Sequence, residues 1–307
     1  MRCVAKMTRF MPGPGCERTS IENALVRLIE KFEQDRSLNE PRNLRQRFEA
    51  LDDLDAYLLD GQAIRAAVRH RATAIYDEME SVNLRLYDDM RRDIQRGSGA
   101  HRLLGWMPDW NAAANLMNRS GYDYLDELVS GALQLEEPPA EVVPLKREMV
   151  SYQPTPARHI FDFIGRAALT ERDSLIDLGS GLGHVTLMAS ICTSANCTGI
   201  ELEPAYVDCA RKSARSLNLS NARFIQGDVR AADLSRGTVF YLYTPFTGGI
   251  LRDVLNLLRD EAVRRGIRIC TFGPCTRVVA EEQWLHVIGA LETDRIAIFR
   301  SRGEPVD

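Results

Sequence analysis

The chain has 307 residues, of which 45% are hydrophobic and 27% charged, as expected for one large or two medium globular domains. Lys and Arg number 39 against 43 Asp and Glu, and the net charge of −4 is not accompanied by a basic stripe, so we expect no nucleic-acid partner. The sequence has neither a membrane-spanning apolar run nor the apolar core of a secretory signal near Met1, so we expect no membrane partner and a cytoplasmic location.

Helical periodicity marks the first part of the chain. Apolar residues recur between Ile64 and Met90 at steps of three, four or seven, which places them on one face of a helix. This helix is predicted to end at the glycine pair Gly97 and Gly99. The predicted helices of this region cover 21–32, 44–59, 61–96, 111–117 and 122–133.

A proline-rich stretch divides the chain. Pro138 and Pro144 bound a segment in which helices cannot continue. We therefore predict an all-helical cap domain over residues 1–145 and a second domain over 146–307. Trp106 and Trp110 of the cap could form a lid over a substrate, and packing inside the cap is the preferred interpretation.

From residue 150 onward, strand-like segments alternate with helical ones. This pattern predicts an α/β fold, a doubly wound and mostly parallel sheet with helices on both faces. The predicted strands cover 174–178, 197–201, 222–226, 237–243, 267–272, 284–288 and 295–300. The last two follow each other too closely for a crossover helix, so we expect them to form an antiparallel pair at the edge of a seven-strand sheet.

A segment with the pattern D-x-G-x-G-x-G ends the first predicted strand. It contains Asp177 and the glycines Gly179, Gly181 and Gly183. Glycine allows a positive φ and lets a ligand approach the backbone. The dinucleotide fingerprint G-x-G-x-x-G is spaced differently and binds a pyrophosphate, which Asp177 would repel. The pattern favours a cationic ligand, and a glycine turn that binds nothing is the alternative.

Two further acids follow strands two and three. Glu201 lies 24 residues after Asp177, near the position where nucleotide-binding folds place an acid that binds ribose. Alternatively, Glu201 stabilises the N-terminus of a helix that begins near Pro204. Asp228 follows the third strand.

With these three acids and the glycine turn, the sequence resembles the class I S-adenosylmethionine (SAM) methyltransferases. The resemblance implies that SAM is the cofactor. It implies that Glu201 contacts the ribose and that Asp228 meets the adenine amino group. The other residues of the motif implied to bind SAM are Asp177, Gly179, Ser180, Gly181 and Gly183.

The end of the fourth strand should face the reacting centre, because ligands bind beyond the carboxyl ends of the strands in doubly wound sheets. Tyr243 could offer a cation–π surface or a hydroxyl to the sulfonium, and we take it as a catalytic candidate. Tyr241 is interpreted as strand packing. The residues that follow, and that we expect to contact the cofactor, are Thr244, Pro245 and Phe246.

Residues 150–275 are also similar to prokaryotic relatives of the non-SET, disruptor-of-telomeric-silencing type of protein-lysine methyltransferase. Tyr152-Gln153-Pro154-Thr155-Pro156 matches a segment that lies over the methionine end of SAM in that family. The resemblance implies that Tyr152 and Thr155 contact the SAM carboxylate or amine, and Tyr152 is our second catalytic candidate. A linker stiffened by prolines and capped by Thr155 is the alternative.

The ending of the fourth strand departs from both groups of relatives. Members that methylate nucleobases or glutamine carry Asn/Asp-Pro-Pro-Tyr/Phe, and the lysine-modifying type has Asn-Asn-Phe or Asn-Pro-Phe-like endings. Here the ending is Thr244-Pro245-Phe246, which lacks the side-chain amide that would accept the protons of a substrate amine. The sequence therefore argues against methylation of planar amines, and lysine specificity does not carry over.

Candidate general bases are few. His159, His184 and His286 could each take a proton near neutral pH, and a structural role is preferred for each. The seven cysteines lack the tight spacing and additional ligands of a zinc site, so we expect buried thiols in a reducing compartment and no metal.

The preferred function is therefore SAM-dependent methyl transfer to a small molecule, with the helical cap closing the site. Three alternatives remain open. One is attack on the aminocarboxypropyl chain of SAM, by cyclisation to azetidine carboxylate or by transfer of that chain, with release of methylthioadenosine. The others are protein-lysine methylation and non-catalytic SAM binding.

Overall fold

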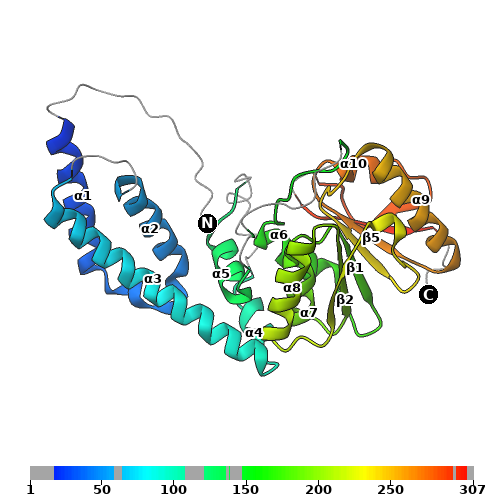
Figure 1. Cartoon of the computed structure of the whole chain (residues 1–307), viewed down its shortest axis with the longest axis horizontal. Helices are drawn as coiled ribbons and strands as arrows, with labels where there is room; N and C mark the ends of the chain where they lie inside the picture. The colour runs from blue at the N-terminus through cyan, green and yellow to red at the C-terminus, as the bar shows by residue number, and fades with distance from the viewer. Residues whose placement is uncertain are drawn as a thin grey trace. The chain divides into compact units, whose positions relative to one another are not determined.

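A computed structural model describes residues 17–58, 64–107, 121–135, 138, 147–292 and 295–302 (Figure 1). The chain forms two compact units, Met1–Leu86 and Tyr87–Asp307. The two units meet after Leu86, whereas the sequence predicts a domain boundary after residue 145. That boundary refers to which part of the chain folds independently, and it stays a prediction. The predicted lid residue Trp110 and the predicted helix over 111–117 lie outside the described residues.

The first unit is helical, as its periodicity predicts. It contains α1 (Glu17–Gln34), α2 (Leu44–Leu58) and the beginning of α3 (Ala66–Gln95). Two short 3-10 helices, η1 (Arg36–Asn39) and η2 (Pro41–Asn43), join α1 to α2. The core of the unit is formed by the apolar faces of the three α-helices, including Leu25, Ile29, Leu51, Leu54 and Met79.

A buried arginine holds the turn between α1 and α2. The side chain of Arg47 is completely inaccessible to solvent. Its guanidinium donates to the carbonyls of Leu38 (3.0 Å) and Pro41 (2.9 Å), to the carbonyl of Glu40, and to Oδ1 of Asn83 (2.7 Å). These bonds tie the backbone carbonyls of the two 3-10 helices to α2.

The second unit is built on a seven-strand sheet of order β3-β2-β1-β4-β5-β7-β6. The first five strands pair in parallel, and β7 runs antiparallel between β5 and β6. The predicted fold class is therefore confirmed, including the antiparallel pair at the edge. The strands are β1 (Ser174–Leu178), β2 (Asn196–Glu201), β3 (Ala222–Gln226), β4 (Val239–Leu242), β5 (Arg268–Thr271), β6 (Leu285–Val287) and β7 (Ala297–Ser301).

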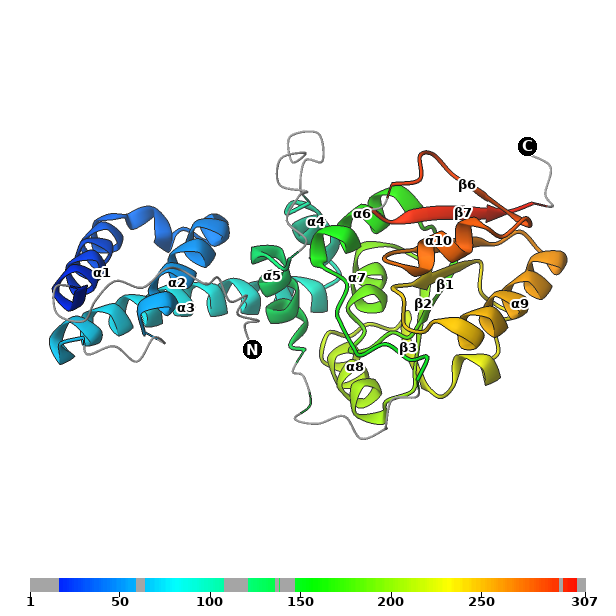
Figure 2. The ribbon, with the colours of Figure 1, turned by 90° about the horizontal axis from the view of Figure 1, so that it is seen from above.

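Helices cover both faces of this sheet (Figure 2). One face carries α7 and α8, and the other carries α9 and α10. The helices of this unit that follow α3 are α4 (Gly99–Leu104), α5 (Tyr124–Leu133), α6 (Ala157–Ala167), α7 (His184–Cys192), α8 (Pro204–Ser216), α9 (Gly248–Arg264) and α10 (Cys275–Ala280). In this unit α5 packs on α6 and α7, and α4 packs on α7. Among the described helices, none combines the length and the apolarity needed to cross a membrane.

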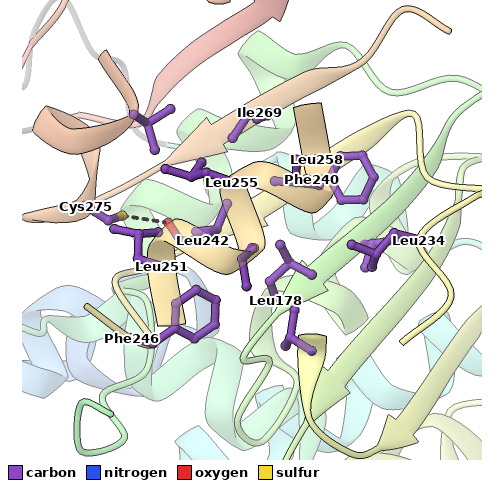
Figure 3. Packing of buried hydrophobic residues seen from close by; sticks show 14 of the residues in the cluster. Leu178, Leu234, Phe240, Leu242, Phe246, Leu251, Leu255, Leu258, Ile269 and Cys275 are labelled. Atoms are coloured by element: carbon purple, nitrogen blue, oxygen red, sulfur yellow. Dashed lines mark hydrogen bonds between the residues drawn. The ribbon is translucent and has the colours of Figure 1, made fainter. Parts of the chain in front are cut away.

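The packing between α9 and the sheet supports the loops that form the site (Figure 3). Leu251, Leu255 and Leu258 of α9 lie against strand residues in one buried cluster. Phe246 after β4 and Cys275 after β5 belong to the same cluster. Burying a leucine or phenylalanine side chain stabilises a fold by about 1.5–3 kcal/mol. The buried Phe246 and Cys275 anchor both loops to this core.

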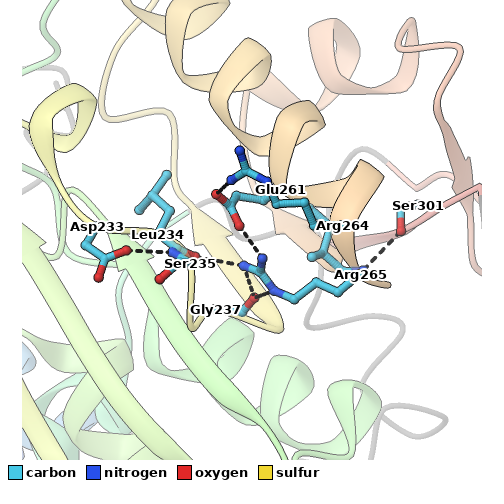
Figure 4. A network of polar contacts seen from close by, with 9 residues as sticks. Asp233, Leu234, Ser235, Gly237, Glu261, Arg264, Arg265 and Ser301 are labelled. Carbon is cyan, nitrogen blue, oxygen red and sulfur yellow. Dashed lines mark hydrogen bonds and ion pairs between the residues drawn. The ribbon is translucent and has the colours of Figure 1, made fainter.

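A polar network fixes the opposite, amino end of β4 (Figure 4). Arg265 donates to the carbonyls of Gly237 (3.0 Å) and Leu234 (2.8 Å) and pairs with Glu261. Because Arg265 takes the Gly237 carbonyl, the strand begins at Val239 rather than at residue 237, where the sequence predicts it.

Candidate cofactor and active site

A cavity of about 410 Å³ lies at the carboxyl ends of the parallel strands. Its volume falls in the range of small-molecule sites, and its position is that of ligands in doubly wound sheets. Gly181 and Gly183 are the two predicted site residues that do not line it. Those that do are Tyr152, Thr155, Asp177, Gly179, Ser180, Glu201, Asp228, Tyr243, Thr244, Pro245 and Phe246.

The glycine turn after β1 is enclosed on two sides. Gly179 and Gly181 both have positive φ (+84° and +52°), which side chains other than glycine rarely adopt. A Cβ on Gly179 would lie 2.4 Å from Cβ of Pro245, and one on Gly181 would lie 2.1 Å from the ring of Tyr152. The turn therefore needs glycine both for its backbone and for the neighbours that close over it.

Gly183 and Ser180 have different surroundings. Gly183 is the residue before α7, has a φ of +87°, and leaves room for the ring of Phe224. The Ser180 hydroxyl is buried, and within the described part of the chain it has no hydrogen-bond partner. A buried hydroxyl beside a glycine cradle is what a polar ligand would complete, so the turn fits a bound SAM.

Asp177 is a buried acid at the floor of the site. It is 3% exposed, and Oδ2 accepts a hydrogen bond from the Thr186 hydroxyl (3.0 Å). Burial, with a smaller contribution from the neighbouring Glu201, raises the pKa of Asp177 from 3.8 to about 7. A cation in the cavity would favour the ionised form of this carboxyl.

Glu201 holds the glycine turn from the end of β2. Its Oε2 accepts the Gly181 N–H (2.8 Å), and Oε1 accepts the N–H groups of Leu202 (2.6 Å) and Glu203 (2.9 Å). The capping role that the sequence offers as the alternative for Glu201 is performed by Glu203, which accepts the Ala205 N–H (3.2 Å) at the start of α8.

Asp228 lines the cavity after β3 and is paired. Its two carboxylate oxygens accept hydrogen bonds from Nε (3.0 Å) and Nη2 (2.7 Å) of Arg230. Oδ1 also accepts a hydrogen bond from the backbone N–H of Arg230 (2.9 Å). An adenine amino group would share this carboxylate with Arg230.

The tyrosines after β4 divide into a packing residue and an accessible one. Tyr241 is 1% exposed, shares a hydrogen bond of 3.0 Å with the Thr155 hydroxyl, and has its pKa raised by burial. The half-buried Tyr243 packs against Phe272 with ring centroids 5.0 Å apart and the rings tilted by 36°. Of the two, Tyr243 presents more surface to a ligand.

Thr244 joins the loops after β4 and β5. Its hydroxyl donates to the Phe272 carbonyl (3.0 Å) and accepts the Cys275 N–H (3.2 Å). Its φ of +43° is unfavourable for a β-branched residue and costs about 1–3 kcal/mol, which these bonds help to offset. The hydroxyl is thus engaged with the backbone, whereas the sequence predicts it to bind the cofactor.

Residues 148–156, which we name the strap, run across the site and are tied first to the loop after β4. Val150 N–H donates to the Pro245 carbonyl (3.1 Å), and Thr247 N–H donates to the Glu148 carbonyl (2.8 Å). The Glu148 carboxylate accepts the Ile250 N–H (3.1 Å) in the first turn of α9. These contacts fix the beginning of the strap.

The other end of the strap is tied to α5 and to the residues just before it. The Tyr122 hydroxyl donates to the Pro154 carbonyl (3.0 Å), and Oδ1 of Asp126 accepts the Ala157 N–H (2.7 Å). Arg158 reaches back to the Gly121 carbonyl (2.7 Å). Thus α5, predicted as part of a separate cap, holds one wall of the cavity.

Tyr152 lies between the two ends of the strap. Its hydroxyl is 3.2 Å from Nδ1 of His184, and its ring lies 4.9 Å from that of Tyr206. Nε2 of His184 is 3.5 Å from the Ser130 hydroxyl on α5. Burial lowers the pKa of His184 to about 4, so this ring is neutral at physiological pH.

The other candidate bases lie away from the cavity. His159 is 5% exposed and packs against Phe272 with centroids 4.1 Å apart, and His286 is an exposed residue of β6. Neither contributes to the lining. Among the described residues, no cluster of His, Cys, Asp or Glu could hold a metal ion.

Sequence reasoning missed several residues of this site. Tyr206, Ser130 and Asp126 carry no motif, and each acquires its role from a neighbour distant in sequence. Glu203 caps α8 through the nearby Ala205 N–H. The acid before Pro204 was the one available signal, because proline in a first helical turn commonly follows a capping residue.

The comparisons with known proteins agree with this geometry. Residues 169–261 match the family model described as a methyltransferase domain. The chain carries a methyltransferase domain. It has the class I sheet order, and SAM is its cofactor. The match covers β1 to β4 and includes Asp177, Glu201 and Asp228.

One curated relative is the release factor glutamine methyltransferase of Vibrio cholerae. It is 33% identical over 112 residues, which span 36% of this chain and 36% of that protein. Among solved structures, an RNA methyltransferase from Salinibacter ruber in complex with S-adenosyl-L-homocysteine is 26% identical, with 50% of this chain and 98% of that chain covered and a TM-score of 0.41. A putative methyltransferase from Escherichia coli is 18% identical, with 53% and 92% covered and a TM-score of 0.39.

Proposed function

We propose that this protein transfers the methyl group of SAM to a small-molecule acceptor. The observation that carries the proposal is the charge of the cavity. Its described lining contains four acidic residues and neither lysine nor arginine; the acids are Asp177, Glu201, Glu203 and Asp228. Such a wall attracts the sulfonium and ammonium of SAM and repels phosphate groups.

The lining residues suit the parts of the cofactor. Glu201 would take the ribose hydroxyls and Asp228 the adenine amino group. Asp177 would face the ammonium, and the hydroxyls of Tyr152 and Thr155 would take the carboxylate. Tyr243 would lie beside the sulfonium, where a ring face and a hydroxyl both stabilise positive charge by about 0.5–2 kcal/mol.

Bound SAM supplies an electrophilic methyl group, and its transfer to the acceptor nucleophile leaves S-adenosylhomocysteine. The protein contributes positioning and the exclusion of water. The strap, tied at Val150 and Pro154, covers the cavity. The hydrogen bond from the Thr244 hydroxyl to the Phe272 carbonyl holds the neighbouring Tyr243 in place. Burial raises the pKa of Tyr243, so its hydroxyl remains protonated and neutral.

The acceptor we propose is neither a nucleic acid nor a protein amide. The names of the relatives refer to RNA and to a release factor, which are their substrates. In this chain Thr244 replaces the Asn or Asp expected for planar amines, and its hydroxyl is engaged with Phe272 and Cys275. We further propose a cytoplasmic location, in agreement with the free thiols of the described cysteines.

Methyl-labelled SAM tests the acceptor class. The full chain is incubated with SAM and a cell extract that has been separated into low-mass, protein and nucleic-acid fractions. We expect label to enter the low-mass fraction only when the protein is present. Transfer of label to the nucleic-acid or the protein fraction would contradict the proposed acceptor, while still supporting methyl transfer.

A further inference from the structure

Three side chains from three elements form a chain of hydrogen-bond contacts that reaches the cofactor cavity. Ser130 lies on α5, His184 begins α7, and Tyr152 belongs to the strap. The Ser130 hydroxyl is 3.5 Å from Nε2 of His184, and Nδ1 of the same ring is 3.2 Å from the Tyr152 hydroxyl. Tyr152 and His184 both line the cavity.

Among the described residues, the cavity offers no cationic side chain to the amino-acid end of SAM. The amino-acid part of the cofactor carries a carboxylate, and the described lining offers this anion no lysine or arginine. Neutral hydrogen-bond donors must therefore hold it. Tyr152 is one, but a hydroxyl can also turn and donate to the histidine instead. The neighbours of the Tyr152 hydroxyl must therefore determine whether its proton points to the histidine or to the carboxylate.

We propose that His184 and Ser130 are positioning residues that direct the Tyr152 hydroxyl proton toward the carboxylate of the bound cofactor. The proposal rests on SAM binding in the proposed function. Nδ1–H of His184 donates to the Tyr152 oxygen, which leaves the Tyr152 proton for the carboxylate. Ser130 donates to Nε2, which is then an acceptor.

The protonation of the ring supports this direction. A neutral imidazole carries one N–H, so a donor at Nδ1 requires an acceptor at Nε2. His184 is neutral because burial lowers its pKa to about 4. The Tyr152 proton goes to the carboxylate because a hydrogen bond to an anion is stronger than one to a neutral ring. Every group in this chain of contacts is then satisfied.

Two ligands separate this role from general stabilisation of the site. S-adenosylhomocysteine has the amino-acid end, and methylthioadenosine lacks it. In calorimetry, Tyr152→Phe should weaken the binding of S-adenosylhomocysteine by about tenfold or more, since a bond to a charged group is lost. His184→Leu and Ser130→Ala should weaken it by less, since the hydroxyl that donates to the carboxylate remains and only its orientation is lost. Methylthioadenosine should stay within about threefold of its wild-type affinity.

A conservative variant provides the matched control. The amide of asparagine can place a donor where Nδ1 stands, so His184→Asn should recover most of the affinity that His184→Leu loses. A thermal melt checks that each variant is folded. If His184→Leu fails to fold, Tyr152→Phe and Ser130→Ala still decide the question, because both remove single hydroxyls.

Nuclear magnetic resonance of isotope-labelled histidine gives a direct readout. The chain has five histidines, and His184→Asn identifies the signal of His184. We expect the Nδ1–H tautomer when S-adenosylhomocysteine is bound, and loss of that preference in Ser130→Ala. An Nε2–H tautomer, or equal losses for both ligands, would overturn the inference. Failure of the wild type to bind S-adenosylhomocysteine would instead overturn the proposed function.

Discussion

The backbone N–H of Ala157, the first residue of α6, donates to Oδ1 of Asp126 on α5 over 2.7 Å. The other oxygen of the same carboxylate accepts the Asp123 N–H (2.6 Å) and completes the capping box of α5. One partly buried side chain therefore joins the starts of two helices at the point where the strap ends. Burial raises the pKa of Asp126 to about 7.

Asp126→Ala should destabilise the second unit. It leaves the N–H groups of Ala157 and Asp123 without their acceptor, at a total cost of about 1–3 kcal/mol because both bonds are partly buried. Asp126→Asn is the matched control, because its amide oxygen can still accept one of the two and should cost less. Urea unfolding measures both changes. An unchanged midpoint for Asp126→Ala would show that the strap is held elsewhere.

Affinity for S-adenosylhomocysteine should rise as the pH increases from about 5.5 to about 7.5. The pKa of Asp177 is about 7 in the folded protein against 3.8 ordinarily, so this acid loses its proton in that range and then attracts the ligand ammonium. For the same reason Asp177 lowers the free energy of unfolding as the pH rises from about 4 through 7. His184, with a pKa of about 4, stays neutral in the tested range.

Calorimetry at several pH values tests the role of Asp177. Asp177→Asn should bind more weakly and show no such pH dependence. Methylthioadenosine, which has no ammonium, should also show none. A wild-type affinity that does not vary with pH would contradict the placement of the ammonium beside Asp177.

Gly181→Ala should abolish cofactor binding while the sheet remains folded. A methyl group there would need a φ of +52° and would lie 2.1 Å from the Tyr152 ring, so both the turn and Tyr152 must move. Gly121→Ala is the control, since nothing lies within 4 Å of the added carbon. Binding and circular dichroism are measured on both. Normal binding by Gly181→Ala would mean that the Tyr152 position is not required.

Arg47→Ala should unfold the first unit without affecting SAM binding by the second. The change removes the guanidinium that donates to the carbonyls of Leu38, Glu40 and Pro41, and hydrogen bonds that involve a charged group contribute about 1.5–3 kcal/mol each. Arg47→Lys should retain part of the bonds. Calorimetric melting would show a lost or lowered first transition. A single shared transition would show that the two units unfold together.

The strands show how much local sequence determines. β1 and β3 match the predicted ranges, because each is a short segment with strand-forming residues that is closed by a glycine turn. β4 is shorter than predicted at both ends. Arg265 takes the Gly237 carbonyl before the strand, and the positive φ of Thr244 turns the chain after it. Both effects come from residues outside the strand pattern.

The site was predictable as far as it is encoded in consecutive residues. The glycine turn and the three acids follow strands at fixed spacing, and the structure brings Asp177, Glu201 and Asp228 to one cavity. The contacts of α5 were not predictable, since Asp126 meets Ala157 and Ser130 meets His184 across long stretches of chain. No local periodicity records such pairs.

The by-product of SAM consumption shows whether the protein transfers the methyl group or the aminocarboxypropyl chain. Pure protein is incubated with SAM alone and with SAM plus the low-mass fraction of a cell extract, and the nucleoside products are identified by mass spectrometry. We expect S-adenosylhomocysteine that appears only when the extract is present. Methylthioadenosine formed from SAM alone, faster than SAM decays by itself, would contradict methyl transfer and show that the aminocarboxypropyl chain reacts.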